Sequence, residues 1–439
     1  MGEDRKGSDG SLDDEPSPVT FSTFGQWIGT LDWGQVARHC LFALVVGVAG
    51  AAGSIVLCLV VDAADRFALS HRFVLFALPV LGVLGLLLYK ALKIPAHEST
   101  DDVVRTFREN RPVSAKLAPG ILAGTALTVL GGGSVGKEAG ALQMGASLGE
   151  LVSRPFGLRA LHRESRARLN GYAAACGMAS CFSALFFSPL GATMFVLELS
   201  RFDRTVVHRL PTMLVGAFIG CAIARAAGIG DVIPAVAVPE VSVELLGGCV
   251  LVGLACGVAG TAFSWGIKGA KRLLRSRVGN PYLAVFAGGA LFAALVFAFR
   301  WFGYMGTGDA LMGRALAGDV AGWDFAVKLL LTVVALGFGF KGGEIMPMFC
   351  IGSLLGCALG AAVGLDAPLL AAAGLAGFFS AASRCPLAAF LIGCEVFGWL
   401  AAPYLVVAVA VAFLCGADAG MYGHGAFRGI VRLKNERRS

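Results

Sequence analysis

Charged side chains are scarce in this chain of 439 residues, of which Asp, Glu, Lys and Arg make up only 15%. A soluble domain carries about a quarter. Apolar runs recur along the sequence, several of them close to the length of about 20 residues that crosses the hydrocarbon core of a bilayer. The shortage of charge therefore excludes an ordinary soluble protein and predicts an all-α polytopic membrane protein.

The chain also lacks the spacings that hold metals or build disulfide frameworks. Its 12 cysteines form no CxxC pair and mostly lie within apolar runs, and its six histidines show no HxxxH spacing. Such cysteines are typical of packed thiols. We therefore predict no metal, no cofactor and no disulfide framework. Because no nucleophile–base pair stands out, we also expect that the protein is not an enzyme.

We expect no secretory signal at the polar start of the chain, since no apolar core follows it. Residues 1–22 are rich in Gly, Ser, Pro and Asp and are predicted to be a disordered tail. Residues 23–439 are predicted to be one transmembrane domain, with a short basic C-terminal tail and no soluble regulatory domain. The net charge of +7 is concentrated in short stretches between apolar runs, at Arg154–Arg168, Arg201–Arg209, Lys268–Arg277 and Arg428–Arg438. This distribution indicates cytoplasmic loops and not nucleic-acid binding.

Glycine, by contrast, is abundant, with 61 residues, and the stretch Gly131–Gly149 (GGGSVGKEAGALQMGASLG) places Lys137 and Glu138 between apolar runs. A carboxylate at membrane depth is a functional-site hypothesis by default. Its start, Gly131-x4-Gly136-Lys137, matches a phosphate loop. However, Glu138 stands where that motif needs a hydroxyl for magnesium, and its charge would repel phosphate. We therefore favour an anion path over a nucleotide site.

An internal repeat organises the chain. Cys176–Ala184 (CGMASCFSA) and Ala373–Ala381 (AGLAGFFSA) share five of nine residues at an offset of 197. The same offset relates Pro189-Leu190 to Pro386-Leu387 and Glu198 to Glu395, and upstream Met144–Gly149 resembles Ile351–Gly356. We predict two repeats, at about 38–225 and 243–416. Short hydrophobic segments at matching places in two halves are typical of transporters that bind their substrate between the repeats.

Each repeat carries a glycine loop followed by an acid, Glu138 in the first and Glu344 in the second. Glycine N–H groups and helix N-termini can hold an anion without a full cation. Pro347 suits the first turn of a helix, which would place Glu344 at its N-terminus. An ionised carboxylate there competes with the anion, whereas a protonated one vacates the site. The alternatives are an ion pair of Glu138 with Lys137 or an interfacial charge, and a purely structural Glu344.

These residues resemble the CLC family of chloride channels and halide–proton antiporters. Gly136–Gly140 (GKEAG) is similar to the gating segment G-[KR]-E-G-P, and Ala184–Glu198 resembles the segment AFxAPLAGxLFxxE. Gly343–Pro347 resembles G-x-F-x-P, and Tyr422 resembles the tyrosine that contacts the central anion. The resemblance implies a CLC-type fold of two inverted helical repeats with broken, half-length helices. It also implies a homodimer in the plasma (inner) membrane that crosses the lipid bilayer many times and carries a halide anion and protons.

The resemblance also assigns site residues. Glu138 would be the proton-linked gate, and the anion-binding residues would be Gly136, Lys137, Glu344, Ile345, Tyr422 and Ser99. The family's first anion motif, G-S-G-I-P, has no clear copy. Its serine falls at Glu98 or Ser99, within the segment His97–Asp101.

Two details are similar to the family's fluoride-exporting branch. One is the loop Gly342-Gly343-Glu344, and the other is the lack of proline after Glu138. Leu199 stands where chloride–proton antiporters carry an inner proton acid. We therefore expect fluoride/proton antiport, with a chloride channel or chloride/proton exchanger as the alternative. A cation-coupled carrier would need carboxylates spread over several helices, and here they gather at the two glycine loops.

Overall fold

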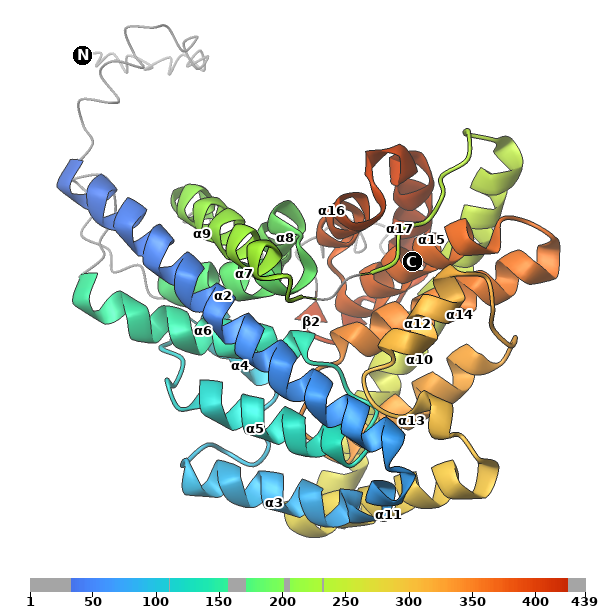
Figure 1. The fold of residues 1–439 in the computed structure, drawn as a ribbon, viewed down its shortest axis with the longest axis horizontal. Helices are drawn as coiled ribbons and strands as arrows, with labels where there is room; N and C mark the ends of the chain where they lie inside the picture. Colours follow the sequence, from blue (N-terminus) through green and yellow to red (C-terminus); the bar gives the residue numbers. More distant parts are fainter. Residues whose placement is uncertain (1–32, 110, 157–170, 201–205, 231–232, 425–439) are drawn as a thin grey trace, which may run out of the picture.

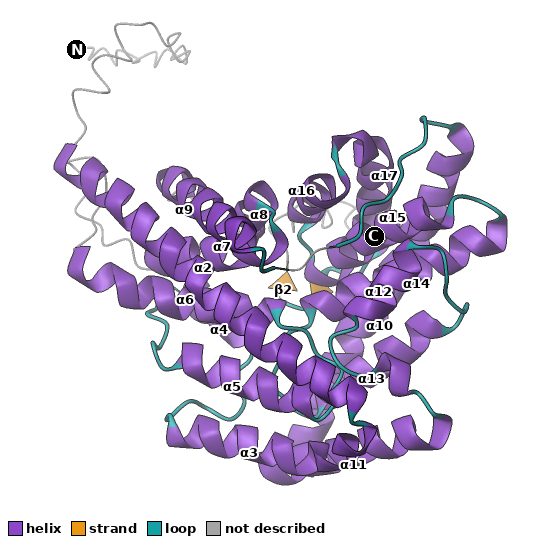
Figure 2. Cartoon of the chain, in the orientation of Figure 1, coloured by secondary structure: helices purple, strands orange, loops and turns teal. Residues whose placement is uncertain are grey.

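The computed structural model describes residues 33–109, 111–156, 171–200, 206–230 and 233–424. The predicted tail 1–22 and the basic stretch Arg428–Arg438 lie outside the described residues, as do most of Arg154–Arg168 and of Arg201–Arg209. Helices dominate the described part, and a hairpin of two-residue strands near its end is the one sheet there (Figure 2).

The first half of the chain contains α2 (Trp33–Ser70), η1 (Arg72–Ala77), α3 (Leu78–Ala91), α4 (Thr100–Arg108), α5 (Leu117–Leu130), α6 (Glu138–Ser153), η2 (Arg154–Phe156), α7 (Tyr172–Phe186), α8 (Pro189–Leu199) and α9 (Val206–Ala227). The second half contains α10 (Val243–Arg277), α11 (Pro281–Phe299), η3 (Phe302–Tyr304), α12 (Asp309–Leu316), α13 (Asp324–Gly337), α14 (Ile345–Val363), α15 (Ala367–Ser383), α16 (Pro386–Phe397), η4 (Trp399–Ala401) and α17 (Ala402–Cys415), followed by β1 (Ala419–Gly420) and β2 (Gly423–His424).

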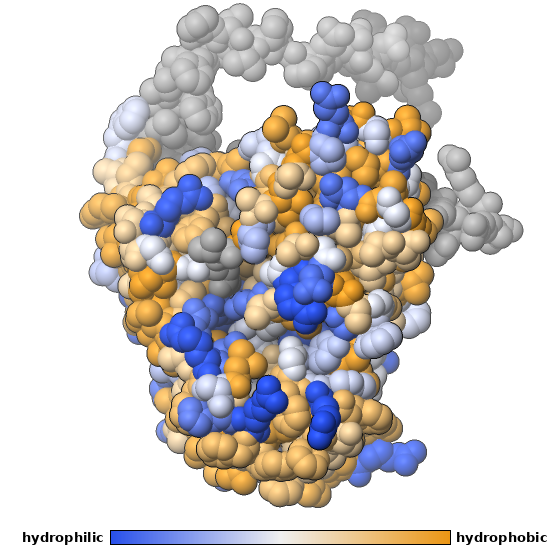
Figure 3. All heavy atoms as spheres, turned by 45° about the vertical axis from the view of Figure 1, so that its right-hand side comes forward, coloured by the Kyte–Doolittle hydropathy of each residue, from blue (hydrophilic) through white to orange (hydrophobic). Residues whose placement is uncertain are grey.

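Within the described residues, six helical segments are long and apolar enough to cross a membrane, and others of 10–17 residues are apolar but shorter. Hydrophobic residues cover much of the face seen in Figure 3, as expected of a surface that contacts lipid tails. Helix α2 is longer than its apolar run. The run near 38–61 predicts its apolar part, and the helix continues through Asp62 and Asp65 to Ser70.

The two halves use the same helix packing. In Figure 1 the first half, blue to green, lies mainly on one side and the second, yellow to red, on the other. A Cβ on Gly177 of α7 would lie 2.0 Å from the Gly145 carbonyl oxygen of α6, and one on Gly374 of α15 would lie 2.2 Å from that of Gly352 of α14. Only glycine permits these close backbone approaches. The predicted repeat is therefore present in the fold.

Contacts between the halves are reciprocal. The Glu198 carboxylate of α8 accepts hydrogen bonds of 3.1 and 2.7 Å from two N–H groups at the start of α16. The Glu395 carboxylate of α16 accepts bonds of 3.0 and 2.8 Å from two N–H groups at the start of α8. Each acid thereby satisfies donors that a helix end leaves unpaired. Such an exchange of identical contacts is what two inverted repeats related by a pseudo-two-fold axis produce.

Candidate functional site

The two glycine loops meet between the halves. The Gly136 N–H donates to the Gly343 carbonyl oxygen at 2.7 Å, and the Gly343 N–H donates to that of Gly136 at 2.6 Å. A Cβ on Gly136 would lie 2.1 Å from Glu138 Oε2, and one on Gly343 would lie 2.7 Å from the Ala139 nitrogen. The loops can approach this closely because both positions are glycine. In this conformation the Gly136 N–H, predicted to contact an anion, is bonded to the protein.

Glu138 is the first residue of α6, and its carboxylate reaches the N-terminus of α14. Its Oε2 accepts a 3.1 Å hydrogen bond from the Met346 N–H, and the side chain is fully buried. The N-terminus of a helix carries partial positive charge and unpaired N–H donors, which makes it an anion site. The Glu138 carboxylate therefore occupies a position suited to an anion. The sequence indicated Ile345 as the donor, whereas the structure places Met346 against the acid.

Glu344 is the N-cap residue of α14, as the sequence predicts from Pro347. Its Oε2 accepts a 3.4 Å hydrogen bond from the Thr100 hydroxyl, which in turn accepts a 3.0 Å bond from Gln143 Nε2. Thr100 and Gln143 are both buried and were not predicted as site residues. Gln143 lies within the glycine-rich stretch Gly131–Gly149, in which only Lys137 and Glu138 were singled out. Thr100 lies within His97–Asp101, where the first anion motif was expected.

Tyr422 lies in the turn between β1 and β2, and its hydroxyl is beside the Glu344 carboxylate. The ring is buried and packs edge-on against Phe195, with 5.9 Å between ring centroids. Arg108 holds the backbone here, since its guanidinium donates to the Tyr422 carbonyl oxygen at 2.7 Å and to the Leu199 carbonyl oxygen at 2.6 Å. Tyr422, predicted to contact the anion, therefore lies beside the second acid, and Arg108 holds its backbone.

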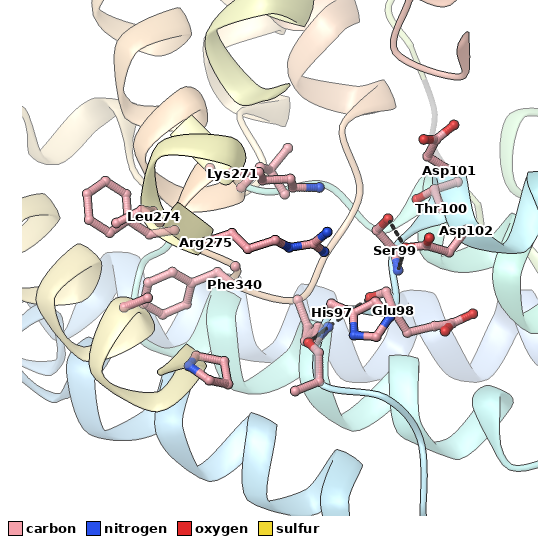
Figure 4. Close-up of a pocket in the computed structure, with 18 of the residues that line it drawn as sticks. His97, Glu98, Ser99, Thr100, Asp101, Asp102, Lys271, Leu274, Arg275 and Phe340 are labelled. Carbon is pink, nitrogen blue, oxygen red and sulfur yellow. Dashed lines mark hydrogen bonds between the residues drawn. The ribbon is translucent and has the colours of Figure 1, made fainter. Parts of the chain in front are cut away.

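A cavity of about 750 Å³ reaches the second acid, Glu344. Thr100, Gln143 and Glu344 line it together with the segment 96–102 and the end of α10. Figure 4 shows Lys271 and Arg275 extending from α10 toward that segment. Cationic side chains at its wall suit the entry of an anion.

Two predicted positions line this cavity in distinct ways. The Ser99 N–H and hydroxyl both donate to Asp102 Oδ2, at 3.2 and 2.7 Å, which caps α4. Its neighbour Glu98 is half-buried, and burial, together with the negative charge of Asp102, raises the pKa of its carboxyl. Since the Ser99 hydroxyl donates to Asp102, Thr100 is the residue of this segment that contacts the second acid.

Each loop also carries a buried lysine with its own partner. Lys137 Nζ donates to Asp62 Oδ1 at 2.5 Å, so the structure places its ammonium on a carboxylate of α2. Lys341 Nζ donates at 2.8 Å to the carbonyl oxygens of both Ala96 and Glu98 and stacks on the Tyr89 ring. In both cases the partners compensate a buried ammonium group, whose burial without a partner would cost free energy. The sequence predicted Lys137 as an anion ligand, and Asp62 was not predicted.

Comparison with known proteins places this geometry in a family. Residues 81–417 match the family described as voltage gated chloride channel. The chain belongs to that family. It is 30% identical over 396 residues to the "Chloride/fluoride channel protein" of Pseudomonas syringae pv. tomato, an alignment that covers 87% of this chain and 84% of that protein. It is 28% identical over 320 residues to the "H(+)/Cl(-) exchange transporter ClcA" of Yersinia pestis, covering 69% of this chain and 64% of that one.

Solved structures of CLC proteins share the fold. A CLC-type fluoride/proton antiporter superposes with a TM-score of 0.79 at 26% identity, covering 92% of this chain and 98% of the other. A slow cyanobacterial Cl⁻/H⁺ antiporter gives a TM-score of 0.72 at 20% identity, covering 92% and 99%. The resemblance inferred from motifs is confirmed, and the chain is a polytopic membrane protein of the CLC type.

Proposed function

We propose that this CLC protein transports a halide across the membrane, and that its main activity is the export of fluoride in exchange for protons, with Glu138 as the gate. One observation carries this proposal: the Glu138 carboxylate occupies the N-terminus of α14, where an anion would bind, directly beside the second acid loop. An anion passing this point has to displace the carboxylate. Protonation of Glu138 removes its charge and releases it from the helix end.

The transport cycle follows from this competition. An anion enters the cavity past the cationic end of α10 and reaches the hydroxyls of Thr100 and Tyr422 beside Glu344. It moves on to the Met346 N–H only when Glu138 is neutral. When the anion has left, the acid loses its proton and returns to the helix end. The carboxyl that moves thus carries the proton, which couples the two fluxes.

The second acid supports fluoride as the substrate. Fluoride is a small, strongly hydrated anion, so a site that replaces its water needs strong hydrogen-bond donors. Thr100, Tyr422 and a protonated Glu344 carboxyl would supply such donors within one buried site. The likeness to a fluoride/proton antiporter and to a chloride/fluoride channel protein agrees with this reading.

Chloride transport, through a channel or in exchange for protons, is the second candidate, since ClcA proteins are described as H⁺/Cl⁻ exchange transporters. Leu199 argues against chloride/proton exchange that uses an inner proton acid at this position, because an aliphatic side chain cannot relay a proton. The Arg108 guanidinium also binds the Leu199 carbonyl oxygen and places a positive charge beside any proton path there.

The membrane setting is part of the proposal. Lys268, Lys271 and Arg275 line the cavity, and from the positive-inside rule we infer that it faces the cytoplasm across a plasma membrane. Helices α9, α16 and α17 expose the apolar side chains Val215, Phe218, Leu387, Val406 and Leu414, a surface we assign to a homodimer contact. This transporter is not expected to be an enzyme.

The test is halide efflux from vesicles that contain the purified protein, with fluoride or chloride inside and the external pH recorded. We expect fluoride efflux, accompanied by proton uptake, to exceed chloride efflux. Faster chloride efflux would contradict the fluoride assignment. Efflux of neither anion would contradict halide transport itself.

A further inference from the structure

A buried glutamine on α6 contacts the pair formed by Thr100 and Glu344. Gln143 lies on the helix that begins at Glu138, and only 2% of its surface is exposed. Its amide Nε2 donates a 3.0 Å hydrogen bond to the Thr100 hydroxyl oxygen, and that hydroxyl donates to Glu344 Oε2 at 3.4 Å. Side chains from α6, from α4 and from the N-cap of α14 thus form a connected row, and all three line the cavity.

The direction of the first bond decides what the Thr100 hydroxyl can do. A threonine hydroxyl has one hydrogen to donate and two lone pairs that accept. Because the Gln143 amide donates to one lone pair, the hydroxyl hydrogen points away from the glutamine and toward Glu344. That hydrogen is therefore available to the carboxylate, or to an anion bound beside it. If an acceptor replaced the amide N–H, the hydrogen would be drawn to the opposite side.

Stability alone does not explain an amide at this position. The other polar atom of the amide, Gln143 Oε1, is buried and accepts no hydrogen bond from the described residues. A buried polar atom without a partner costs about 1–3 kcal/mol, whereas a hydrogen bond such as that to Thr100 contributes about 0.5–1.5 kcal/mol. The two contributions offset each other. An apolar side chain of similar size would fold at least as well, so the amide calls for a different explanation.

We propose that Gln143 is a positioning residue that sets halide specificity, because it fixes the Thr100 hydroxyl as a donor toward an anion beside Glu344. This inference rests on the proposed function and deepens it. Fluoride is smaller than chloride and accepts shorter and stronger hydrogen bonds, so it gains more from an oriented donor. A hydroxyl that turns freely loses part of that advantage. Gln143 thereby raises the preference for fluoride over chloride.

The experiment compares Gln143→Met with the wild type in halide efflux from vesicles, over a concentration series of fluoride and of chloride. Methionine has a similar length and volume but cannot donate to Thr100. We expect KM for fluoride to rise about fivefold, in line with the loss of one oriented donor. KM for chloride and both maximal rates should change by less than about twofold. Proton uptake per fluoride released should match that of the wild type, since Glu138 is intact.

Two further variants and a stability measurement make the test specific. Thr100→Val removes the hydroxyl, so Gln143→Met is expected to have no further effect on KM for fluoride in that background. Ser147→Ala is the matched control, because Ser147 is buried on the same helix but donates to the Ser114 carbonyl oxygen at 2.8 Å. It should leave the preference between the halides unchanged. Thermal unfolding of Gln143→Met in detergent should occur no lower than that of the wild type.

Three outcomes would overturn the inference. One is an unchanged KM for fluoride in Gln143→Met, and another is a full rise when Thr100→Val is already present. The third is an equal rise for chloride with a lower unfolding temperature, which is the result expected of a purely structural side chain. The wild type separates this claim from the proposed function. Wild-type vesicles that release chloride faster than fluoride, or neither halide, contradict the proposed function. If the wild type prefers fluoride and Gln143→Met prefers it equally, only the role of Gln143 is contradicted.

Discussion

The two glycine loops are built alike and bonded differently. Both contain a buried lysine and end in an acid at a helix N-terminus, and they bond to each other through Gly136 and Gly343. Glu138 accepts from a backbone N–H of the opposite repeat, whereas Glu344 accepts from a side-chain hydroxyl. A helix end is a fixed anion site, so an acid on it competes with the substrate. A hydroxyl can rotate and donate to an anion or to a carboxyl, so an acid beside it can assist binding.

The largest effect is expected from substitution of the two acids, which should change proton coupling in one variant and halide preference in the other. Glu138→Gln cannot ionise, so it is expected to lower proton flux by about 100-fold or more, in line with the loss of a group that carries a proton. Glu344→Gln keeps the gate and should remain proton-coupled while losing its preference for fluoride. Simultaneous recording of halide efflux and proton uptake checks both variants. Equal loss of coupling in the two would show that the loops do not divide the roles as we infer.

A substitution that disturbs the contact between the two loops should have nearly as large an effect on transport. Gly136→Ala places a methyl 2.7 Å from the Met346 Cβ and 2.1 Å from Glu138 Oε2, which forces the loops apart. Overpacking of this kind costs about 1–3 kcal/mol. Thermal unfolding in detergent should therefore occur at a lower temperature, and transport should fall. Gly140→Ala is the control, because its nearest neighbour would be at an ordinary 3.5 Å; an equal loss there would refute the packing argument.

The lysine of the second loop should show a smaller effect. Lys341→Met removes two hydrogen bonds to the segment 96–98 but also removes a buried charge, and these changes partly offset each other. We expect the segment 96–98 to be held less firmly in the cavity wall. The affinity for halide entering from the cavity side should then fall by about threefold, on the order of 0.7 kcal/mol. Concentration series of halide flux measure it. The exposed Lys90→Met serves as the control, and an identical response in both variants would exclude a role for this contact.

The smallest effect concerns Glu98 at the cavity wall. Burial raises the pKa of this carboxyl, so it is neutral in acid and ionised as the pH rises. An ionised Glu98 repels an entering anion, so Glu98→Gln should improve halide uptake from the cavity side about twofold at high pH and leave it unchanged at low pH. Flux measured over a pH series on that side tests this. Glu109→Gln, at an exposed site, is the control, and a gain that did not depend on pH would argue against titration of Glu98.

The fold was largely predictable because its main features repeat in the sequence. Five identities in nine residues linked α7 to α15, and apolar runs indicated most of the helices, including short ones, but not α4 or α12. The positions of Glu138 and Glu344 at the starts of helices were predicted from the neighbouring glycines and from Pro347. The end of α2 was not predicted, since the long apolar run stops before Asp62 and the helix continues through Asp62, Asp65 and Arg66 to Ser70.

The partners of the acids were not predictable. Met346, Thr100 and Asp62 contact residues that lie 208, 244 and 75 positions away, and no motif assigned these contacts to them. The contacts of Met346 and Thr100 depend on how the two repeats pack, and that of Asp62 depends on how α2 packs against the first loop. Composition and spacing do not encode such packing for a single position. Lys137 is an example. Its motif suggested that the ammonium binds an anion, whereas in the fold the ammonium contacts the Asp62 carboxylate.

The exchange of helix caps by Glu198 and Glu395 has a consequence for biogenesis. Neither repeat contains the acid that completes its own short helix, since α8 is capped from α16 and α16 from α8. During synthesis we therefore expect the start of α8 to stay uncapped until α16 has been inserted beside it. The protein is thus assembled as two interdependent halves rather than as one unit after another.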